Sequence, residues 1–132
     1  MQIKTIKILN RSLEITYING LSEIIYKTLE TYFNDLLLDS LTTYKGRINA
    51  IKNKYHYKKC VPIYITSNCC FIPTTKLDDI DNLFINVYAI LNIINQNDKT
   101  KIIFKDNTSI IINKRYQQFI INVKRANLIE PQ

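Results

Sequence analysis

Only two glycines, Gly20 and Gly46, occur in this chain of 132 residues, and they stand far apart. A G-x-x-x-x-G-K-[ST] phosphate loop and a G-x-G-x-x-G dinucleotide turn each need glycines close together, because the backbone must approach the phosphates. The sequence therefore lacks both motifs, and we do not expect an enzyme that hydrolyses nucleotides or transfers hydride. The single histidine, His56, also leaves no pair of histidines for a metal site or a proton relay.

The cysteines favour free thiols in a reducing compartment. Cys60, Cys69 and Cys70 are odd in number, and the adjacent pair suits neither a disulfide framework nor a C-x-x-C motif. With His56 they would supply four zinc ligands, but their spacing differs from that of zinc fingers, and neighbours on a strand point to opposite faces. A Cys–His nucleophile pair lacks a recognisable orienting group. We expect no metal, no cofactor and no catalytic residue.

The hydropathy pattern favours a cytoplasmic protein without a membrane partner. The segment Met1 to Lys7 alternates apolar and charged residues, unlike a secretory signal peptide. The most apolar segment, Leu83 to Ile94, is interrupted by Asn86 and Asn92 and is much shorter than the ~20 residues that span a bilayer.

Residue periodicity predicts a single α+β domain over residues 1–132, with an antiparallel β-sheet and flanking helices. A polar acidic loop is expected at Thr75–Asn82. The segment Leu21–Leu41 is ambiguous: helical spacing favours a helix over at least Asn34–Leu41, but Glu23–Phe33 is rich in residues that suit strands. Strands are expected at Ile3–Leu9, Leu13–Ile18, Val61–Thr66, Cys69–Ile72, Phe84–Ile94 (a buried strand), Lys101–Lys105 and Ser109–Asn113.

A C-terminal helix is predicted from an N-cap at Asn113 to about Leu128. Its apolar side is expected to contain Tyr116, Phe119, Ile120, Val123 and Asn127. The opposite side carries a polar stripe spaced three or four residues apart, namely Arg115, Gln118, Asn122 and Arg125. Arg pairs with guanine and Asn or Gln with adenine in the major groove, so this stripe is a candidate for base contacts, although an ordinary solvated helix face has the same composition.

The formal net charge of +7 has one source in the sequence. The stretch from Ser40 to Leu77 contains seven basic residues and no acidic residue, while the other 11 basic residues balance the 11 acidic residues. Its densest part, Lys45 to Lys59, is interleaved with aromatic side chains. Cations neutralise phosphates and release counterions, and tyrosines hydrogen-bond phosphate oxygens or pack on sugars. This pattern favours a nucleic-acid partner, although a solvated lysine-rich segment would have the same charge.

Several short motifs resemble the ComK family of competence transcription factors. Tyr44-Lys45-Gly46-Arg47 is similar to that family's Tyr-x-Gly-Arg element. Val61-Pro62-Ile63 and Phe71-Ile72-Pro73-Thr74 match its paired strands in the same order, and Leu83-Phe84-Ile85-Asn86 lies where the family has a Trp-Ile pair. Phe104-Lys105-Asp106-Asn107 resembles its hairpin, and Tyr116–Leu128 falls on its closing helix. The chain departs from the family pattern in having Phe84 for the Trp, Leu41 for a Cys and Thr108 for the hairpin Gly.

The resemblance implies a sequence-specific DNA-binding activator of DNA-uptake genes. Such a protein would recognise AT-rich double-stranded DNA, largely through the minor groove, as a dimer or higher homo-oligomer, and would contact RNA polymerase. The candidate phosphate-contacting cations are Lys45, Arg47, Lys52, Lys54, Lys58 and Lys59. Gly46 would allow a tight turn or a close approach to phosphate, and Arg115 and Arg125 are further candidates for groove contacts.

Three alternatives remain open from the sequence. Residues Phe84–Ile120 loosely resemble the end of LytTR-type DNA-binding domains, which also bind bacterial promoters. An RNA-binding module could stack bases on Tyr55 and Tyr57. A non-catalytic interaction protein related to such regulators would fold without any affinity for nucleic acid.

Overall fold

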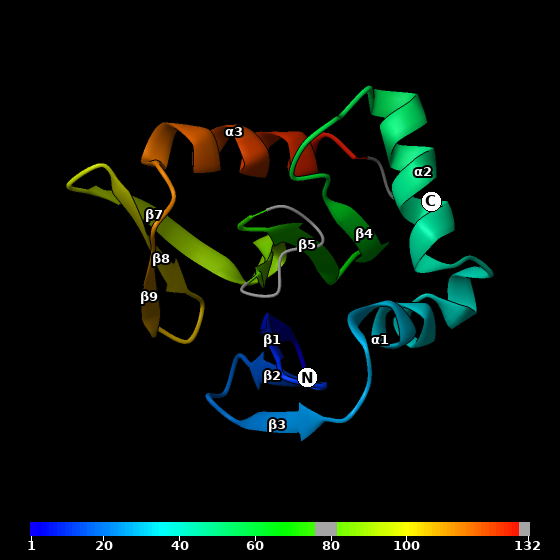
Figure 1. Cartoon of the computed structure of the whole chain (residues 1–132). Helices are drawn as coiled ribbons and strands as arrows, with labels where there is room; N and C mark the ends of the chain where they lie inside the picture. Colours follow the sequence, from blue (N-terminus) through cyan, green and yellow to red (C-terminus); the bar gives the residue numbers. More distant parts are fainter. Residues whose placement is uncertain (76–81, 130–132) are drawn as a thin grey trace.

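A six-stranded antiparallel sheet, in the order β3-β2-β1-β6-β5-β4, forms the centre of the molecule (Figure 1). The computed structural model describes residues 1–75 and 82–129, so most of the predicted loop at Thr75–Asn82 lies outside the described residues. The strands of this sheet are β1 (Ile3–Leu9), β2 (Ser12–Tyr17), β3 (Ser22–Ile25), β4 (Ile63–Thr66), β5 (Cys69–Pro73) and β6 (Leu83–Asn86). The predicted α+β class with an antiparallel sheet and a C-terminal helix is confirmed.

A smaller three-stranded sheet follows, formed by β7 (Ile90–Gln96), β8 (Lys99–Phe104) and β9 (Ser109–Ile112). The prediction of one buried strand over Phe84–Ile94 is wrong, because the short 3-10 turn η2 (Val87–Ala89) carries the chain from one sheet to the other. Leu91 and Ile94 are exposed, at 59% and 39%. In β8, however, Ile102 and Phe104 are fully buried and alternate with more exposed residues, as expected for a strand with one face in the core.

The side chain of Asn86 accounts for the break between the two sheets. Its Oδ1 accepts hydrogen bonds from the backbone N–H of Cys70, at 3.1 Å, and of Tyr88, at 3.2 Å. Its Nδ2 donates to the backbone oxygens of Ile3, at 2.8 Å, and Asn68, at 3.0 Å. An amide has two donor hydrogens and two acceptor lone pairs, so all of its capacity is used. Asn86 therefore replaces ladder hydrogen bonds where β6 ends.

Two helices occupy the chain between β3 and β4, namely α1 (Leu29–Leu36) and α2 (Tyr44–Tyr55), with the 3-10 turn η1 (Leu38–Ser40) between them. The expected helix over Asn34–Leu41 is therefore only partly correct. Thr28 caps α1 by accepting a hydrogen bond from the Thr31 N–H, so the helix starts earlier than expected, and Leu41 ends η1 in the left-handed region at φ 57°. The strand-forming residues upstream form β3 at the edge of the sheet.

The C-terminal helix α3 (Tyr116–Asn127) lies across β5, β7 and β8 (Figure 1). It begins after Arg115, which provides no side-chain cap, so the predicted N-cap at Asn113 is wrong. Its buried residues are Phe119, Asn122 and Ala126, whereas Asn127 is exposed. The buried face is thus rotated from the expected one toward the polar stripe.

An aromatic cluster around Phe33 joins the helices to the large sheet. The Phe33 ring stacks on Tyr44 of α2, with the ring centres 5.2 Å apart. Its centre lies 5.7 Å from that of Phe71 in β5 and 5.5 Å from that of Phe84 in β6. Phe33, Phe71 and Phe84 are fully buried. Because one ring touches α2 and two central strands, this cluster fixes the position of α2 against the sheet.

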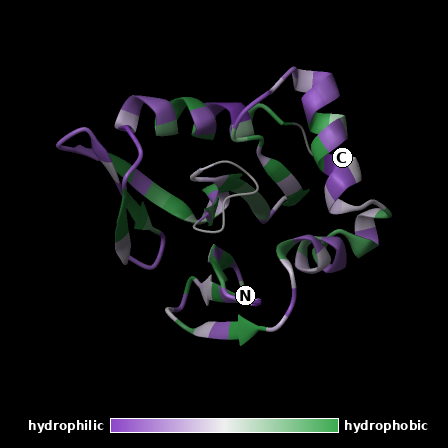
Figure 2. Cartoon of the chain, in the orientation of Figure 1, coloured by the Kyte–Doolittle hydropathy of each residue, from purple (hydrophilic) through white to green (hydrophobic). Residues whose placement is uncertain are grey.

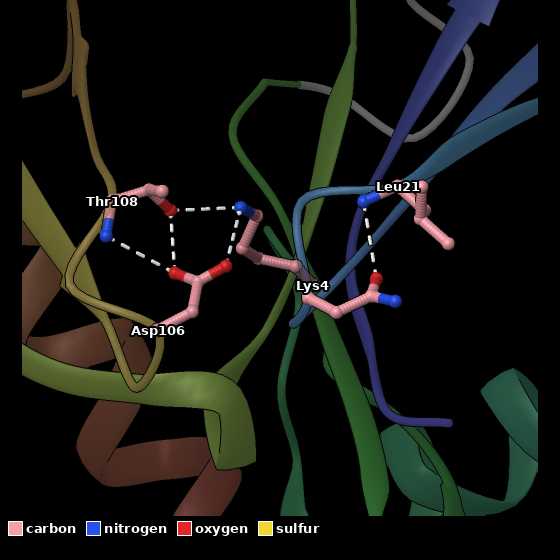
Figure 3. Close-up of polar contacts among 5 residues, drawn as sticks. Lys4, Leu21, Asp106 and Thr108 are labelled. Carbon is pink, nitrogen blue, oxygen red and sulfur yellow. Dashed lines mark hydrogen bonds and ion pairs between the residues drawn. The ribbon is translucent and has the colours of Figure 1, made fainter.

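A buried ion pair joins the two sheets. Lys4 Nζ of β1 lies 3.1 Å from Asp106 Oδ2 and donates a hydrogen bond to Thr108 Oγ1 at 2.8 Å (Figure 3). Asp106 and Thr108 belong to the turn between β8 and β9, and the Lys4 ammonium also lies 5.3 Å from the centre of the Phe104 ring. The Lys4 side chain is 8% exposed, so this charge is used inside the protein.

Candidate nucleic-acid interface

The helix α2 carries most of the basic candidates. Thr43 caps its first turn by accepting a hydrogen bond from the Gly46 N–H at 3.1 Å. Ile48 and Ile51 are buried, and Tyr44 and Tyr55 are half-buried on the same side. These four residues follow helical spacing, which indicates the buried face of a helix. The assignment of the tyrosines to a nucleic-acid-binding stretch concealed this signal. The remaining side is largely hydrophilic (Figure 2).

Gly46 lies in the first turn of α2, so its expected role in a tight turn is wrong. A Cβ at this position would come within 3.1 Å of Thr42 Oγ1 and 3.2 Å of Thr43 Oγ1. Both contacts are tighter than ordinary van der Waals distance. A side chain at this position would therefore require the hydroxyls of Thr42 and Thr43 to move by a few tenths of an ångström.

The cations of α2 lie on two different flanks of the helix. Arg47 and Lys54 are seven residues apart and share the flank that faces β4, because seven residues make about two helical turns. Lys45 and Lys52 are also seven apart and share another flank, about 160° away around the helix. Lys45 lies 3.6 Å from Glu30, and Lys52 lies beside His56 and Lys58. The sequence predicted the cations but not this division.

The flank of Arg47 and Lys54 borders a groove between α2 and β4 with a volume of about 630 Å³, which we call the α2–β4 groove. The guanidinium of Arg47 lies 5.9 Å from the centre of the Tyr64 ring, a cation–π contact that holds it against the wall. In the described part of the chain, no carboxylate forms a salt bridge with Arg47 or Lys54. Their charges are therefore not neutralised by an ion pair within those residues.

A pair of stacked tyrosines, each with a cation beside its ring, joins the C-terminal ends of α2 and α3. The Lys54 ammonium lies 5.4 Å from the Tyr55 ring centre, and Tyr55 stacks on Tyr57 at 5.6 Å. The Arg125 guanidinium lies 5.5 Å from the Tyr57 ring centre, and the Tyr57 hydroxyl donates a 3.1 Å hydrogen bond to the Arg125 carbonyl oxygen. Burial raises the pKa of Tyr57 and outweighs the opposing charge of Arg125.

The loop after α2 presents the remaining lysines of the basic stretch. His56 ends the helix in the left-handed region at φ 61°, which turns the chain away from the helix axis. Lys58 and Lys59 follow and are exposed. Because Tyr57 is bonded to α3, the loop is tied down directly before these two lysines, which supports their use as a fixed pair of charges.

The polar stripe predicted on the last helix is not a continuous surface. Asn122 is buried at 1% exposure, so the expectation that it reads bases is wrong. Its Oδ1 accepts a 3.4 Å hydrogen bond from Gln118. Arg115 is exposed and lies 3.1 Å from Asp98 Oδ2, and Arg125 belongs to the tyrosine stack. The structure thus separates Arg115 from Arg125 and places only Arg125 beside the basic stretch.

The cysteines differ strongly in accessibility. Burial raises the pKa of the Cys69 thiol to about 11 and that of Cys70 to about 12, which disfavours the thiolates that bind metals. Cys60 is half-buried, with Lys114 Nζ 3.3 Å from its Sγ. Among the described residues, no three His, Cys, Asp or Glu side chains are grouped in a way that could hold a metal ion.

The family model described as ComK protein matches residues 4–131, nearly the whole chain. The chain belongs to the ComK family. Comparison with curated proteins gives no significant match, and comparison with solved structures gives none either. The predicted family is confirmed, and it is a family of competence transcription factors rather than of enzymes. In the part of the chain that the structure describes, no helix is long and apolar enough to cross a membrane.

Proposed function

We propose that this ComK-family protein is a transcription activator that binds AT-rich double-stranded DNA in the cytoplasm through α2 and the loop after it. The observation that carries the proposal is the concentration of the chain's excess positive charge on one exposed helix and its adjoining loop. Duplex DNA is a dense array of phosphates, and cations on a fixed scaffold release its counterions. Family membership supports DNA as the partner.

Double-stranded DNA fits this surface better than single-stranded RNA does. Recognition of single strands depends on bases that stack on aromatic rings. Here Tyr55 and Tyr57 stack on each other, and Lys54 and Arg125 each form a cation–π contact with one of the two rings. The tyrosines therefore support cations, and the cations are the groups presented to a phosphate backbone.

A homo-oligomer that contacts RNA polymerase belongs to the same proposal. The strand β3 lies at an edge of the large sheet, and Leu21, Ile24 and Tyr26 are exposed at or beside it. An exposed, apolar edge strand readily pairs with another chain, which supports self-association there. Sedimentation with and without DNA measures the oligomeric state.

Fluorescence anisotropy with an AT-rich duplex, a GC-rich duplex and a single-stranded RNA of equal length tests the proposal. We expect the AT-rich duplex to bind most tightly, with affinity falling steeply between about 50 and 200 mM salt. The variant Lys58→Ala/Lys59→Ala should reduce the salt slope by about two, since each lysine that contacts a phosphate contributes about one.

The matched control is Lys7→Ala/Lys105→Ala, which removes the same charge from two exposed lysines of the β-strands and the hairpin turn. It should leave the slope nearly unchanged. An equal loss in both variants would mean that only net charge matters. Tighter binding of the RNA would favour the RNA-binding alternative, and absence of binding to any nucleic acid at low salt would refute the proposal.

A further inference from the structure

The α2–β4 groove has the size and lining of a ligand site. Its volume of about 630 Å³ lies within the usual range for small-molecule pockets, about 300–1,000 Å³. One wall is a flank of α2 with Arg47 and Lys54, and the opposite wall is β4 with the turn after it. Three α2 cations, Arg47, Lys52 and Lys54, form no salt bridge among the described residues, and the groove combines two of them, Arg47 and Lys54, with a concave surface.

The chemistry of the lining suits a phosphate beside a ring. A guanidinium forms paired hydrogen bonds to phosphate oxygens, and an ammonium adds a point charge. Ser40, Thr42, Thr66 and Ser67 also line the groove and carry hydroxyl groups that form hydrogen bonds. Asp39 adds one carboxylate to the lining, so the phosphate of a ligand is expected on the side of Arg47 and Lys54 and away from Asp39. Ile51, Ile65 and Ile129 belong to the core, and their few exposed atoms form the apolar floor of the groove, against which a sugar or a base would pack.

Small residues keep the α2 wall low. Gly46 and Ala50 line the groove one helical turn apart. A side chain at Gly46 would displace the hydroxyl of Thr42, which itself borders the groove. The α2 wall therefore carries no long side chain at these two positions.

We propose that the α2–β4 groove binds one nucleotide unit, with its phosphate between Arg47 and Lys54 and its sugar or base against Ile51 and Ile65. The nucleotide belongs either to a DNA strand, in which case the inference rests on the proposed function, or to a free nucleotide that acts as an effector. Both sources present the same phosphate and ring, and they are distinguished by experiment.

The experiment uses amide NMR spectra of the whole chain, titrated separately with ATP, inorganic phosphate and an AT-rich duplex. We expect saturable shifts at Ser40, Thr66 and Ser67 with the duplex or with ATP, and weaker effects with inorganic phosphate, which has no ring. The variant Arg47→Ala/Lys54→Ala should weaken this binding about tenfold or more. The comparison variant Lys45→Ala/Lys52→Ala removes the same charge from the other flank of the same helix, where the proposed function also places phosphate contacts. It should weaken binding of the duplex, but it should change binding of ATP much less than Arg47→Ala/Lys54→Ala does.

A second variant separates a shaped site from a field of positive charge. Ala50→Gln leaves every cation in place but fills the groove from an exposed helical position, where glutamine is well tolerated. We expect it to weaken groove binding without lowering thermal stability. Equal binding by Ala50→Gln and the unaltered chain would overturn the inference, as would equal losses of ATP affinity in the two double variants.

The outcomes separate this inference from the proposed function. Shifts in the groove with ATP, but no binding of the duplex, would refute DNA binding and retain a site for a free nucleotide. Salt-dependent binding of the duplex, with no shifts in the groove from any probe, would retain the proposed function and refute the nucleotide site. Shifts with the duplex alone would assign the groove to a nucleotide of the DNA strand.

Discussion

Lysines in two regions of the molecule serve opposite purposes. Lys4 is buried between the two sheets and bonded to Asp106 and Thr108. On α2, Lys54 is exposed, and its one cation–π contact among the described residues is with the ring of Tyr55. A buried charge must be paired because desolvation is costly, whereas an exposed charge beside a ring keeps its capacity to bind an outside anion. The same residue type thus holds the fold together in one region and remains available for a partner in the other.

The largest expected effect is a loss of stability when the buried lysine, Lys4, is removed. Lys4→Ala should lower the free energy of unfolding by about 3 kcal/mol, because it leaves the Asp106 carboxylate without its cation in a mostly buried site. Denaturant unfolding measures the loss. The double variant Lys4→Ala/Asp106→Asn should recover part of it, since no unpaired charge remains. A change below about 0.5 kcal/mol in Lys4→Ala would show that the pair is no more important than a surface ion pair.

The same pair predicts a dependence of stability on pH. Burial by itself raises the pKa of Asp106, but hydrogen bonds from Thr108 and the Lys4 ammonium outweigh it, so the pKa lies below its usual value. A carboxyl group whose pKa is depressed in the folded state stabilises the protein fully above its unfolded pKa, about 4, and loses that contribution as pH falls through the folded pKa. The difference in unfolding free energy between the unaltered chain and Asp106→Asn should be constant above about pH 5 and shrink below about pH 4. A difference that stays constant down to pH 2 would contradict this mechanism.

The smallest effect is expected at an exposed ion pair. The side chains of Arg115 and Asp98 are 80% and 60% exposed, so Arg115→Ala should change stability by less than about 0.5 kcal/mol. The same variant tests the predicted groove contact of Arg115 by anisotropy with the AT-rich duplex. A loss of affinity of about tenfold would place Arg115 among the DNA contacts, and no loss would restrict the interface to α2, its loop and Arg125.

Much of the fold could be predicted, because a strand with one buried face shows an alternation of core and solvent-facing residues in its own sequence. Ile102 and Phe104 alternate with Lys101, Ile103 and Lys105, and β1, β2, β5 and the β8–β9 hairpin lie close to their expected positions. The division of Phe84–Ile94 between two sheets could not be predicted. It depends on hydrogen bonds from Asn86 to Ile3 and Asn68, which lie far away in the sequence.

The candidate site was predictable in its charges but not in its shape. Counting Lys and Arg located the basic stretch without any knowledge of structure. The two flanks of α2 are defined by the burial of Ile48 and Ile51 against the core, which a count of charges does not reveal. Asn122 was misplaced for a related reason: α3 packs on three strands, and its buried side includes a polar residue that periodicity assigns to solvent.

The four hydrogen bonds of Asn86 also make the fold sensitive to deamidation at this position. Deamidation would replace the Nδ2 donor with a carboxylate oxygen, which would then face the carbonyl oxygens of Ile3 and Asn68. Burial keeps water from this amide while the chain is folded. A chain that has deamidated while unfolded would therefore carry a buried negative charge against two acceptors when it refolds. This charge would destabilise the folded state.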